Sequence, residues 1–334
     1  MLSPSRLRQR LLWLFGLLFL ALSQVYGQIC EVEDGAEDCN GYCIADECEV
    51  VPLSLQLVPF FDVGTPRQVF SVDLNGDGAL DIVLTGIDVL ADPPFRIWVF
   101  LHEAEGSFAS PALFDGGQGL QNLAFADAEG DGDLDVFAVH RDFFSVLLND
   151  GRGRLSPSNS YSGVGGAHVI ALGDISGDGR PDVVVSNDPG GSDGDSVSLF
   201  ENAGDGTFQD GVEFAVGGSP RRVVVADLDV DGDLDVLTLN RSSRDLSILK
   251  NDGGSLAEAT SYFYVSSEQP SFTGDAFFAG DFDGDGATDL IVRGGTRMVV
   301  LLNRNDGTMG FRDAVPYEVS PGSARVGDFD ADGD

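Results

Sequence analysis

The hydrophobic residues of this chain fall into short runs separated by loops rich in Asp, Gly and Asn. Val223–Ala226, Val236–Leu239 and Leu246–Leu249 are three such runs in succession, and aliphatic residues dominate all three. Short apolar runs bounded by turn-forming residues are typical of buried β-strands. The pattern therefore predicts an all-β protein.

One complete structural unit can be followed from Ser219 to Ser267. Its strands are expected at Arg222–Ala226, Asp235–Leu239, Leu246–Lys250 and Thr260–Val265. The turn after the third strand is rich in Asn, Asp and Gly, which favour the positive φ angles of hairpin turns. Phe108, Phe208 and Phe311 follow the corresponding turns at similar offsets. We expect these three rings to pack between neighbouring units.

A nine-residue acidic loop joins the first and second strands of each unit. Complete copies begin at Asp73, Asp127, Asp174, Asp227 and Asp281, and an incomplete copy begins at Asp328. These first positions lie 54, 47, 53, 54 and 47 residues apart. A repeat of this length with four short strands fits the blade of a β-propeller.

Oxygen-bearing side chains occupy loop positions 1, 3, 5 and 9, and glycine occupies position 6. The residues at the four positions are Asp73, Asn75, Asp77 and Asp81; Asp127, Glu129, Asp131 and Asp135; Asp174, Ser176, Asp178 and Asp182; Asp227, Asp229, Asp231 and Asp235; Asp281, Asp283, Asp285 and Asp289; and, in the incomplete copy, Asp328, Asp330 and Asp332. Calcium binds six to eight oxygen ligands, which a turning backbone can direct to one point. A single Asp- and Gly-rich segment would be an ordinary surface turn. Repetition of the whole pattern favours calcium.

These loops resemble the FG-GAP or VCBS repeats, because each follows an apolar strand such as Val223–Ala226 and leads into another such as Asp235–Leu237. Repeats of that family build the β-propeller of integrin α-subunits and of many secreted proteins. The resemblance covers about residues 53–334. It implies about five calcium sites and an incomplete sixth, each held by side chains at positions 1, 3, 5 and 9. It further implies a backbone carbonyl ligand at position 7, which here is Ala79, Asp133, Arg180, Asp233 or Ala287.

Position 3 departs from the usual Asp or Asn in two loops, which carry Glu129 and Ser176. Affinity in such loops follows ligand charge and rigidity. We therefore expect the loop beginning at Asp174 to bind calcium most weakly, and the loops beginning at Asp227 and Asp281 to bind it most tightly.

The repeats predict a propeller domain over residues 51–334 with five complete four-stranded blades and parts of a sixth. Leu53–Asp62 resembles the outer strand of a blade although it precedes the first inner strand. The last inner strand is expected near Ala324–Gly327. These features predict a six- or seven-bladed parent propeller that is C-terminally incomplete in this sequence.

Residues 1–27 read as a signal peptide. Three arginines precede the apolar run Leu11–Leu22, and small residues follow at Ser23 and Gly27, after which we expect cleavage. The run has 12 residues, whereas a membrane-spanning helix needs about 20. An uncleaved membrane anchor is the alternative. The sequence predicts a secreted, extracellular protein without later membrane insertion, or a periplasmic or cell-surface protein if it is anchored by a segment beyond Asp334.

Residues 28–50 form a cysteine-rich module that contains Cys30, Cys39, Cys43 and Cys48. An even number of cysteines directly after an export signal favours two disulfides, for which three pairings are possible. A zinc site is the alternative, although its usual paired knuckles are missing. Lipid attachment at Cys30 is a third possibility with a poor sequence context.

The chain has 19 basic and 55 acidic residues and a net charge of −36. This balance argues against nucleic acids and anionic membranes as partners. Much of the charge lies in the repeated loops, where carboxylates without metal would repel one another at short range.

We expect recognition on the face opposite the acidic loops, because loops on a rigid scaffold commonly carry binding sites. That face includes Gly86–Phe95, His140–Phe144 and Asn187–Asp195. The residues six positions before each acidic loop are expected on the same face, where the inner strands begin. They are Arg67, Gln121, His168, Arg221, Asp275 and Gly322. Ordinary solvated turns are the alternative reading of each segment.

These features predict a binding or adhesion module for an extracellular protein or glycan. A lectin is one alternative. Another is a carbohydrate-active enzyme of the polysaccharide-lyase kind, in which His168 and Arg221 would act on a uronic acid. The three histidines form no known catalytic motif, so we expect no enzymatic activity. The oligomeric state is left open by the sequence.

If calcium binds only the folded chain, its removal must lower stability. We predict that a chelator sharply lowers the melting temperature and that added calcium restores it, as measured by differential scanning fluorimetry. A melting temperature that is the same with and without chelator would rule out structural calcium.

Overall fold

The computed structural model describes residues 64–88, 92, 94–103, 107–189, 195–262, 276–294, 297–304 and 311–318. The chain divides into two units, Met1–Pro59 and Phe60–Asp334, and all described residues belong to the second. The expected signal peptide, the cysteine-rich module, the Asp328 loop and the strand at Leu53–Asp62 lie outside the described residues, as do Asp275 and Gly322. The described residues include no helix with the length and hydropathy that crossing a membrane requires.

The described strands form five four-stranded antiparallel sheets. A hairpin of two short strands, each of two residues, lies between the third and fourth strands of the first sheet. The first sheet contains β1 (Thr65–Val72), β2 (Asp81–Ile87), β3 (Phe95–Phe100) and β6 (Ala112–Asp115), and the hairpin contains β4 (His102–Glu103) and β5 (Ser107–Phe108). The second contains β7 (Asn122–Ala126), β8 (Asp135–Val139), β9 (Phe143–Asn149) and β10 (Leu155–Ser162). The third contains β11 (Ile170–Gly173), β12 (Asp182–Asn187), β13 (Ser196–Phe200) and β14 (Val212–Ala215). The fourth contains β15 (Pro220–Ala226), β16 (Asp235–Asn240), β17 (Asp245–Leu249) and β18 (Thr260–Tyr262), and the fifth contains β19 (Ala276–Gly280), β20 (Asp289–Gly294), β21 (Arg297–Asn303) and β22 (Phe311–Glu318).

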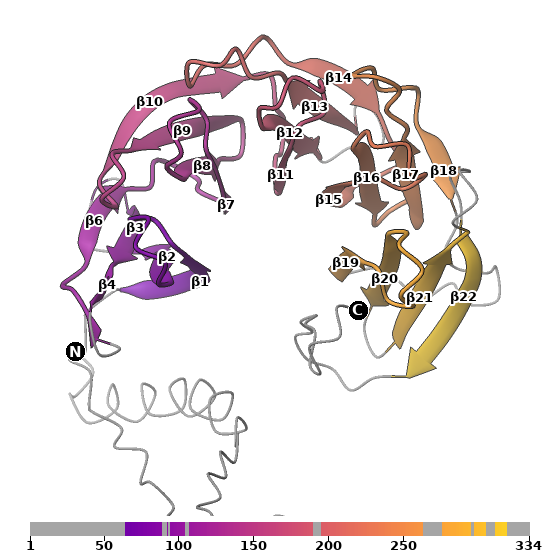
Figure 1. Cartoon of the computed structure of the whole chain (residues 1–334), viewed down its shortest axis with the longest axis horizontal. Helices are drawn as coiled ribbons and strands as arrows, with labels where there is room; N and C mark the ends of the chain where they lie inside the picture. Colours follow the sequence, from indigo (N-terminus) through magenta and orange to yellow (C-terminus); the bar gives the residue numbers. More distant parts are fainter. Residues whose placement is uncertain are drawn as a thin grey trace, which may run out of the picture. The chain divides into compact units, whose positions relative to one another are not determined.

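Within each sheet the spatial order of the strands follows the chain, so each sheet is a simple meander. The first strand of each sheet lies on the inner side, and the last lies on the outer side (Figure 1). Successive sheets are neighbours, because β11 lies between β7 and β15, and β15 in turn contacts β19. This arrangement confirms the predicted all-β fold of four-stranded propeller blades.

Five of the middle strands, in the second, third and fourth sheets, are buried along their whole length, which explains their apolar runs. Every residue of β8, β12, β13, β16 and β17 is buried. A strand covered on both faces has no polar face and therefore shows no alternation. The four strands expected between Ser219 and Ser267 are present in the fourth sheet, in register from Val224 opposite Leu237 to Ile248 opposite Thr260.

The hydrophobic core is divided among four clusters, each shared by two neighbouring sheets. Val83 of the first sheet and Val136 of the second belong to one cluster, and Leu239 of the fourth and Leu290 of the fifth belong to another. The apolar residue at position 2 of an acidic loop takes part in every one of them; these residues are Leu74, Ala128, Ile175 and Leu228. The loops are therefore anchored in the packing between sheets.

The predicted packing of two phenylalanines between sheets is confirmed. Phe208, beyond the third strand of its sheet, contacts Phe137 of the second sheet edge-to-face at 5.7 Å. Phe311 contacts Tyr262 of the fourth sheet in the same manner at 5.1 Å. Phe108 contacts His102 within the β4–β5 hairpin instead.

A buried asparagine at or just after the end of the third strand joins neighbouring sheets by hydrogen bonds. Asn251 Nδ2 donates to the carbonyl oxygen of Ile175 in the preceding sheet's loop at 2.7 Å, and to that of Leu234 in its own loop at 3.1 Å. Asn149, Asn202 and Asn303 make the same pair of bonds, to the loop carbonyls of Leu74, Ala128 and Leu228 in the preceding sheet and of Leu134, Pro181 and Thr288 in their own. These asparagines were expected only to form turns; in the structure they also connect the sheets.

We predict that Asn251→Ala lowers the free energy of unfolding by about 1–3 kcal/mol, because two buried carbonyl groups lose their donor. Urea unfolding at saturating calcium would measure the change. Asn159→Ala, on an exposed stretch of β10, is the control and should change stability by less than about 0.5 kcal/mol. Equal effects of the two substitutions would contradict a cross-sheet role for Asn251.

Candidate metal centres in the acidic loops

The carboxylate at position 1 shapes each acidic loop by accepting backbone hydrogen bonds. In the loop between β15 and β16, Asp227 Oδ1 accepts from the amide of Asp231 at 3.2 Å, and its Oδ2 accepts from the amide of Gly232 at 3.0 Å. The equivalent carboxylates of the other four described loops accept from the same two amides; they are Asp73, Asp127, Asp174 and Asp281. One side chain therefore fixes the curvature of the turn before any ion binds.

The loop backbone takes positive φ at positions 4 and 6. Position 6 is glycine in every described copy, with φ of 97° at Gly232. Position 4 is also glycine in four copies, but in the loop between β15 and β16 it is Val230, with φ of 60°. A β-branched residue is strained in this region, because its Cβ approaches the neighbouring carbonyl oxygen. The need for glycine at position 4 was not anticipated from the sequence.

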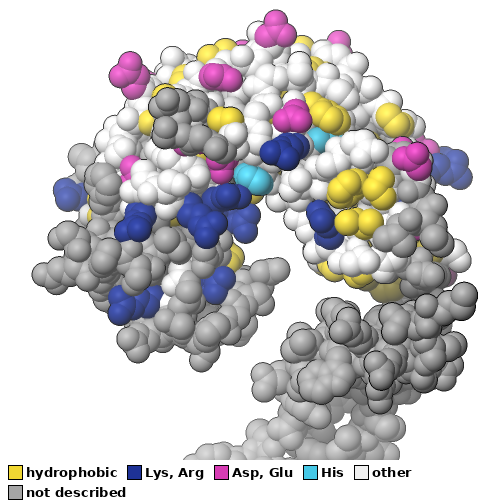
Figure 2. All heavy atoms as spheres, turned by 180° about the vertical axis from the view of Figure 1, so that it is seen from behind, with side chains coloured by type: hydrophobic (Ala, Val, Ile, Leu, Met, Phe, Trp, Pro, Cys, Tyr) yellow, Lys and Arg dark blue, Asp and Glu magenta, His cyan; other side chains and the backbone are white. Residues whose placement is uncertain are grey.

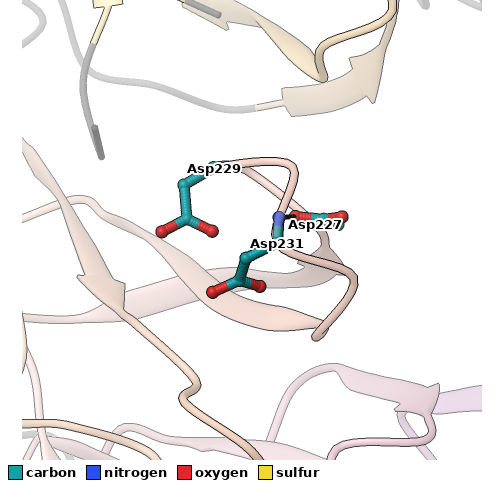
Figure 3. A group of neighbouring side chains, drawn as sticks. All are labelled: Asp227, Asp229 and Asp231. Carbon is teal, nitrogen blue, oxygen red and sulfur yellow. Dashed lines mark hydrogen bonds between the residues drawn. The ribbon is translucent and has the colours of Figure 1, made fainter. Parts of the chain in front are cut away.

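Two loops bring three carboxylates close together. Single oxygen atoms of Asp227, Asp229 and Asp231 lie within 4.8 Å of one another, with all three side chains carried by one loop (Figure 3). The same holds for the loop between β19 and β20, in Asp281, Asp283 and Asp285. These are the two loops that the sequence predicted to bind calcium most tightly.

The other three described loops do not form such a triad of acidic groups. Position 3 is the neutral Asn75 in the first loop and the neutral Ser176 in the third. In the second loop the longer Glu129 is acidic, but oxygen atoms of Asp127, Glu129 and Asp131 do not all lie within 4.8 Å of one another. Burial, followed by the neighbouring charge of Asp131, raises the pKa of Glu129.

Two position-3 oxygen atoms are buried without a hydrogen-bond donor. They are Asp229 Oδ1 and Ser176 Oγ. A buried polar atom without a partner is costly. The oxygen-only chemistry of these loops and the unsatisfied oxygen atoms fit a hard cation.

The aspartate at position 9 is fully buried and accepts backbone hydrogen bonds on both oxygens. Asp235 Oδ2 accepts from the amide of Leu228 at 2.9 Å, and Oδ1 accepts from that of Asn251 at 2.8 Å. Asp81, Asp135, Asp182 and Asp289 are equally buried and make the equivalent pair of bonds. Position 9 therefore ties the loop to the end of the third strand.

The position-9 aspartates are not members of the two carboxylate clusters. Burial raises the pKa of Asp235 to about 6, although the two amide hydrogen bonds favour the charged form. Each carboxylate oxygen that accepts one hydrogen bond keeps a further lone pair. Metal ligation by position 9, and by the carbonyl groups at position 7, stays a prediction.

A lysine ammonium group lies against one of the two clusters. Lys250 Nζ contacts Asp229 Oδ2 and lies 3.2 Å from Asp231 Oδ2. Hydrogen bonds to Asp229 and then to Asp231 raise the pKa of Lys250, so it stays charged. The equivalent residue beside the Asp281 loop is the uncharged Leu302, since each directly precedes the sheet-joining asparagine. This internal cation was not predicted from the sequence.

The opposite ends of the inner strands surround a polar pocket of about 290 Å³. Of the residues expected on this face, Gln121, His168 and Arg221 line the pocket, whereas Arg67 lies over the ring of Phe95. Arg221 Nη1 donates to His168 Nε2 at 3.0 Å. Burial and the adjacent charge of Arg221 lower the pKa of His168, which keeps its ring neutral and able to accept this bond.

His140, also expected on the recognition face, is buried instead. It is 2% exposed and stacks on Phe143 at 4.1 Å between ring centres. Its Nδ1 donates to the carbonyl oxygen of Gln118, and its Nε2 accepts from the Ser145 hydroxyl. Burial lowers its pKa. In this structure His140 packs within the domain rather than presenting its ring to a ligand.

Five overlapping matches to the model of the FG-GAP-like repeat extend over residues 73–138, 128–185, 174–238, 231–292 and 281–334. The chain belongs to the FG-GAP-like repeat family. Each match begins in or near an acidic loop and extends into the next one, as expected from the repeat.

One solved structure similar to this chain is that of a lectin from Agrocybe aegerita, which is described as recognising non-reducing terminal N-acetylglucosamine. It is 22% identical, with a TM-score of 0.53, over 75% of this chain and 66% of the lectin. The Vibrio cholerae biofilm matrix protein Bap1 is 17% identical, with a TM-score of 0.43, over 76% of this chain and 39% of that protein. These likenesses concern the fold alone. No curated protein matches the sequence.

The positive φ of Val230, at position 4 of the fourth acidic loop, predicts that glycine would be more stable there. Val230→Gly should raise the free energy of unfolding by about 1 kcal/mol, because it removes the left-handed strain of a side chain that is 54% exposed. Chemical denaturation would measure the change. Val212→Gly removes a similarly exposed valine from the regular strand β14 and should instead destabilise by about 0.5–1 kcal/mol. Destabilisation by both substitutions would contradict the proposed strain.

The contrast between Lys250 and Leu302 predicts that the two carboxylate clusters differ in calcium affinity. Lys250→Met should strengthen calcium binding in the Asp227 loop, and Leu302→Lys should weaken it in the Asp281 loop, each by at least about threefold, since affinity follows the net charge of the ligand set. Amide NMR shifts of Gly232 and Gly286 would report the two loops separately during a calcium titration. If neither substitution changes the affinity of its own loop, Lys250 does not compete with the metal.

Proposed function

We propose that this chain is an exported, calcium-stabilised β-propeller that binds a glycan through the face opposite its acidic loops. The observation that carries this proposal is the separation of two kinds of site along the inner strands. β15 begins beside Arg221 in the pocket and ends at Ala226, directly before the acidic loop. Metal and ligand would therefore occupy opposite ends of the same strands.

The carboxylates at positions 1, 3 and 5 would hold the ion, most tightly in the Asp281 loop, where no lysine competes. A bound calcium ion would supply positive charge that offsets the repulsion among these groups and satisfies oxygen atoms such as Asp229 Oδ1. The same charge would lower the raised pKa of Asp235 toward its usual range. Ion binding would thus stabilise the carboxylate on which the loop's attachment to the sheet depends.

Several features support a glycan as the ligand. The pocket is lined by amide and guanidinium side chains, including Gln121 and Arg241, which suit the hydroxyl groups of a sugar. The FG-GAP-like fold is shared with a lectin that is described as recognising N-acetylglucosamine. A protein partner would use the same face, and it is the alternative outcome of the experiment below.

The contact between His168 and Arg221 favours binding over catalysis. His168 Nε2 already accepts a hydrogen bond from a permanently charged guanidinium group. That nitrogen cannot remove a proton from a substrate unless the contact breaks. We therefore assign no catalytic role to the pair.

Export rests on the sequence features of residues 1–27, and two disulfides among the four cysteines at positions 30–48 would suit an oxidising compartment. Extracellular calcium would also keep loops of modest affinity occupied.

We predict selective binding of the calcium-loaded protein on a glycan array, with loss of binding after chelation because the scaffold unfolds. Gln121→Ala, in the pocket, should weaken the binding. Gln209→Ala, which affects a side chain bonded to Glu201 outside the pocket, should leave it unchanged. A folded, calcium-loaded protein that binds no glycan would overturn the glycan proposal and leave a protein ligand.

A further inference from the structure

The pocket opposite the acidic loops has a charge opposite to that of the whole protein. Arg221, Arg222 and Arg241 line it, and none of the described residues in its lining is acidic, although the chain carries a net charge of −36. The amide side chains of Gln68 and Asn122 complete the lining. In Figure 2, dark blue and cyan side chains gather near the inner edge of the described sheets, with few acidic side chains beside them. The molecule therefore concentrates positive charge where its inner strands begin.

Four consecutive sheets contribute to this pocket. Gln68 belongs to β1, Asn122 begins β7, His168 precedes β11, and Arg222 belongs to β15. Arg241 directly follows β16. These side chains lie within strands or close to strand ends in four different sheets. The cluster is therefore part of the rigid scaffold rather than of a single turn.

The positive charges are only partly neutralised within the described part of the chain. Arg221 Nη2 lies 3.5 Å from the carboxylate of Asp188, which is 5% exposed. The Nε atom of Arg221 is buried and has no acceptor. Arg222 and Arg241 form no ion pair with another described residue. Among the residues that the structure describes, at least two guanidinium groups of the pocket are therefore not paired with a carboxylate.

His168 orients the central guanidinium group. As a neutral acceptor, its Nε2 holds Arg221 Nη1, while Asp188 holds Nη2 from another side. A guanidinium group fixed at both terminal nitrogens loses little further entropy when it binds a planar or tetrahedral anion. The amide groups around it can bind neighbouring hydroxyl groups.

We propose that this pocket binds the anionic group of an acidic sugar, a carboxylate or a sulfate, within an extracellular glycan. Guanidinium groups recognise both anions by paired, charge-assisted hydrogen bonds. The surrounding amides provide contacts for the sugar ring. This inference rests on the proposed glycan-binding function and makes it specific to acidic sugars.

The test compares a hyaluronan tetrasaccharide with its methyl ester, which has the same ring skeleton but no carboxylate charge. Isothermal titration calorimetry with the calcium-loaded protein at low ionic strength should show that esterification weakens binding at least about tenfold. A sulfated chondroitin tetrasaccharide whose uronic acids are methyl-esterified carries sulfate as its only anion, and its affinity relative to the hyaluronan tetrasaccharide tests whether sulfate is preferred to carboxylate. Inorganic sulfate alone should bind much more weakly than either oligosaccharide, because it lacks the contacts of the sugar ring.

Arg241→Gln is the variant of choice, because Arg241 is exposed and has no described partner whose loss would disturb folding. It should weaken binding of the acidic tetrasaccharide about tenfold. Arg152→Gln removes the same charge from an exposed turn outside the pocket and should change binding less than about twofold. Equal losses in the two variants would show a general charge effect and overturn the pocket assignment.

The outcomes separate this inference from the function on which it rests. Binding of neutral glycans on the array, together with equal affinity for the acid and its ester, would overturn the acidic-sugar pocket and leave the glycan-binding function intact. Absence of binding to every glycan would overturn both. Preferential binding of either acidic tetrasaccharide, lost in Arg241→Gln but not in Arg152→Gln, would support both.

Discussion

A buried carboxylate with two backbone hydrogen bonds is the interaction on which each blade depends. The carboxylate of Asp235 accepts one hydrogen bond from the start of the acidic loop and another from the end of the third strand, and its four equivalents do the same. The asparagine at that point, such as Asn251, then reaches the loop of the preceding sheet. Since the position-2 residue of that loop also enters the core between sheets, polar and apolar contacts join the same elements. The loops therefore connect the blades as well as carrying the candidate metal ligands.

Charge is divided between the two ends of the inner strands. The acidic loops gather carboxylates at one end, and in the fourth loop the ammonium group of Lys250 lies against them. The other ends gather arginines around His168, and no described residue of that lining is acidic. Because the two charged regions lie at opposite ends of the same inner strands, the strands hold them apart. A ligand at one end and an ion at the other can then bind without competing.

The repeated loop allowed the fold to be predicted from the sequence, because the same spacing of carboxylates recurs with apolar strands on either side. It also identified the Asp227 and Asp281 loops as those with the strongest acidic clusters. The hydrogen bonds of the asparagines could not be predicted, since an Asn before a turn has a sufficient local explanation. Lys250 was missed for a related reason: it is distant in sequence from Asp229, and only strand pairing brings the two together. The Val230 strain was missed, although glycine at position 4 of the other four described loops is the sequence signal of a positive φ at that position.

The central claim is that the carboxylates at positions 1, 3 and 5 of the acidic loops bind calcium while the buried carboxylate at position 9 supports the blade. A crystal structure of the protein grown in calcium tests it most directly. We expect anomalous density within reach of Asp281, Asp283 and Asp285, with Asp289 still accepting from the amides of Phe282 and Asn303. Well-ordered loops without an ion at saturating calcium would contradict the claim.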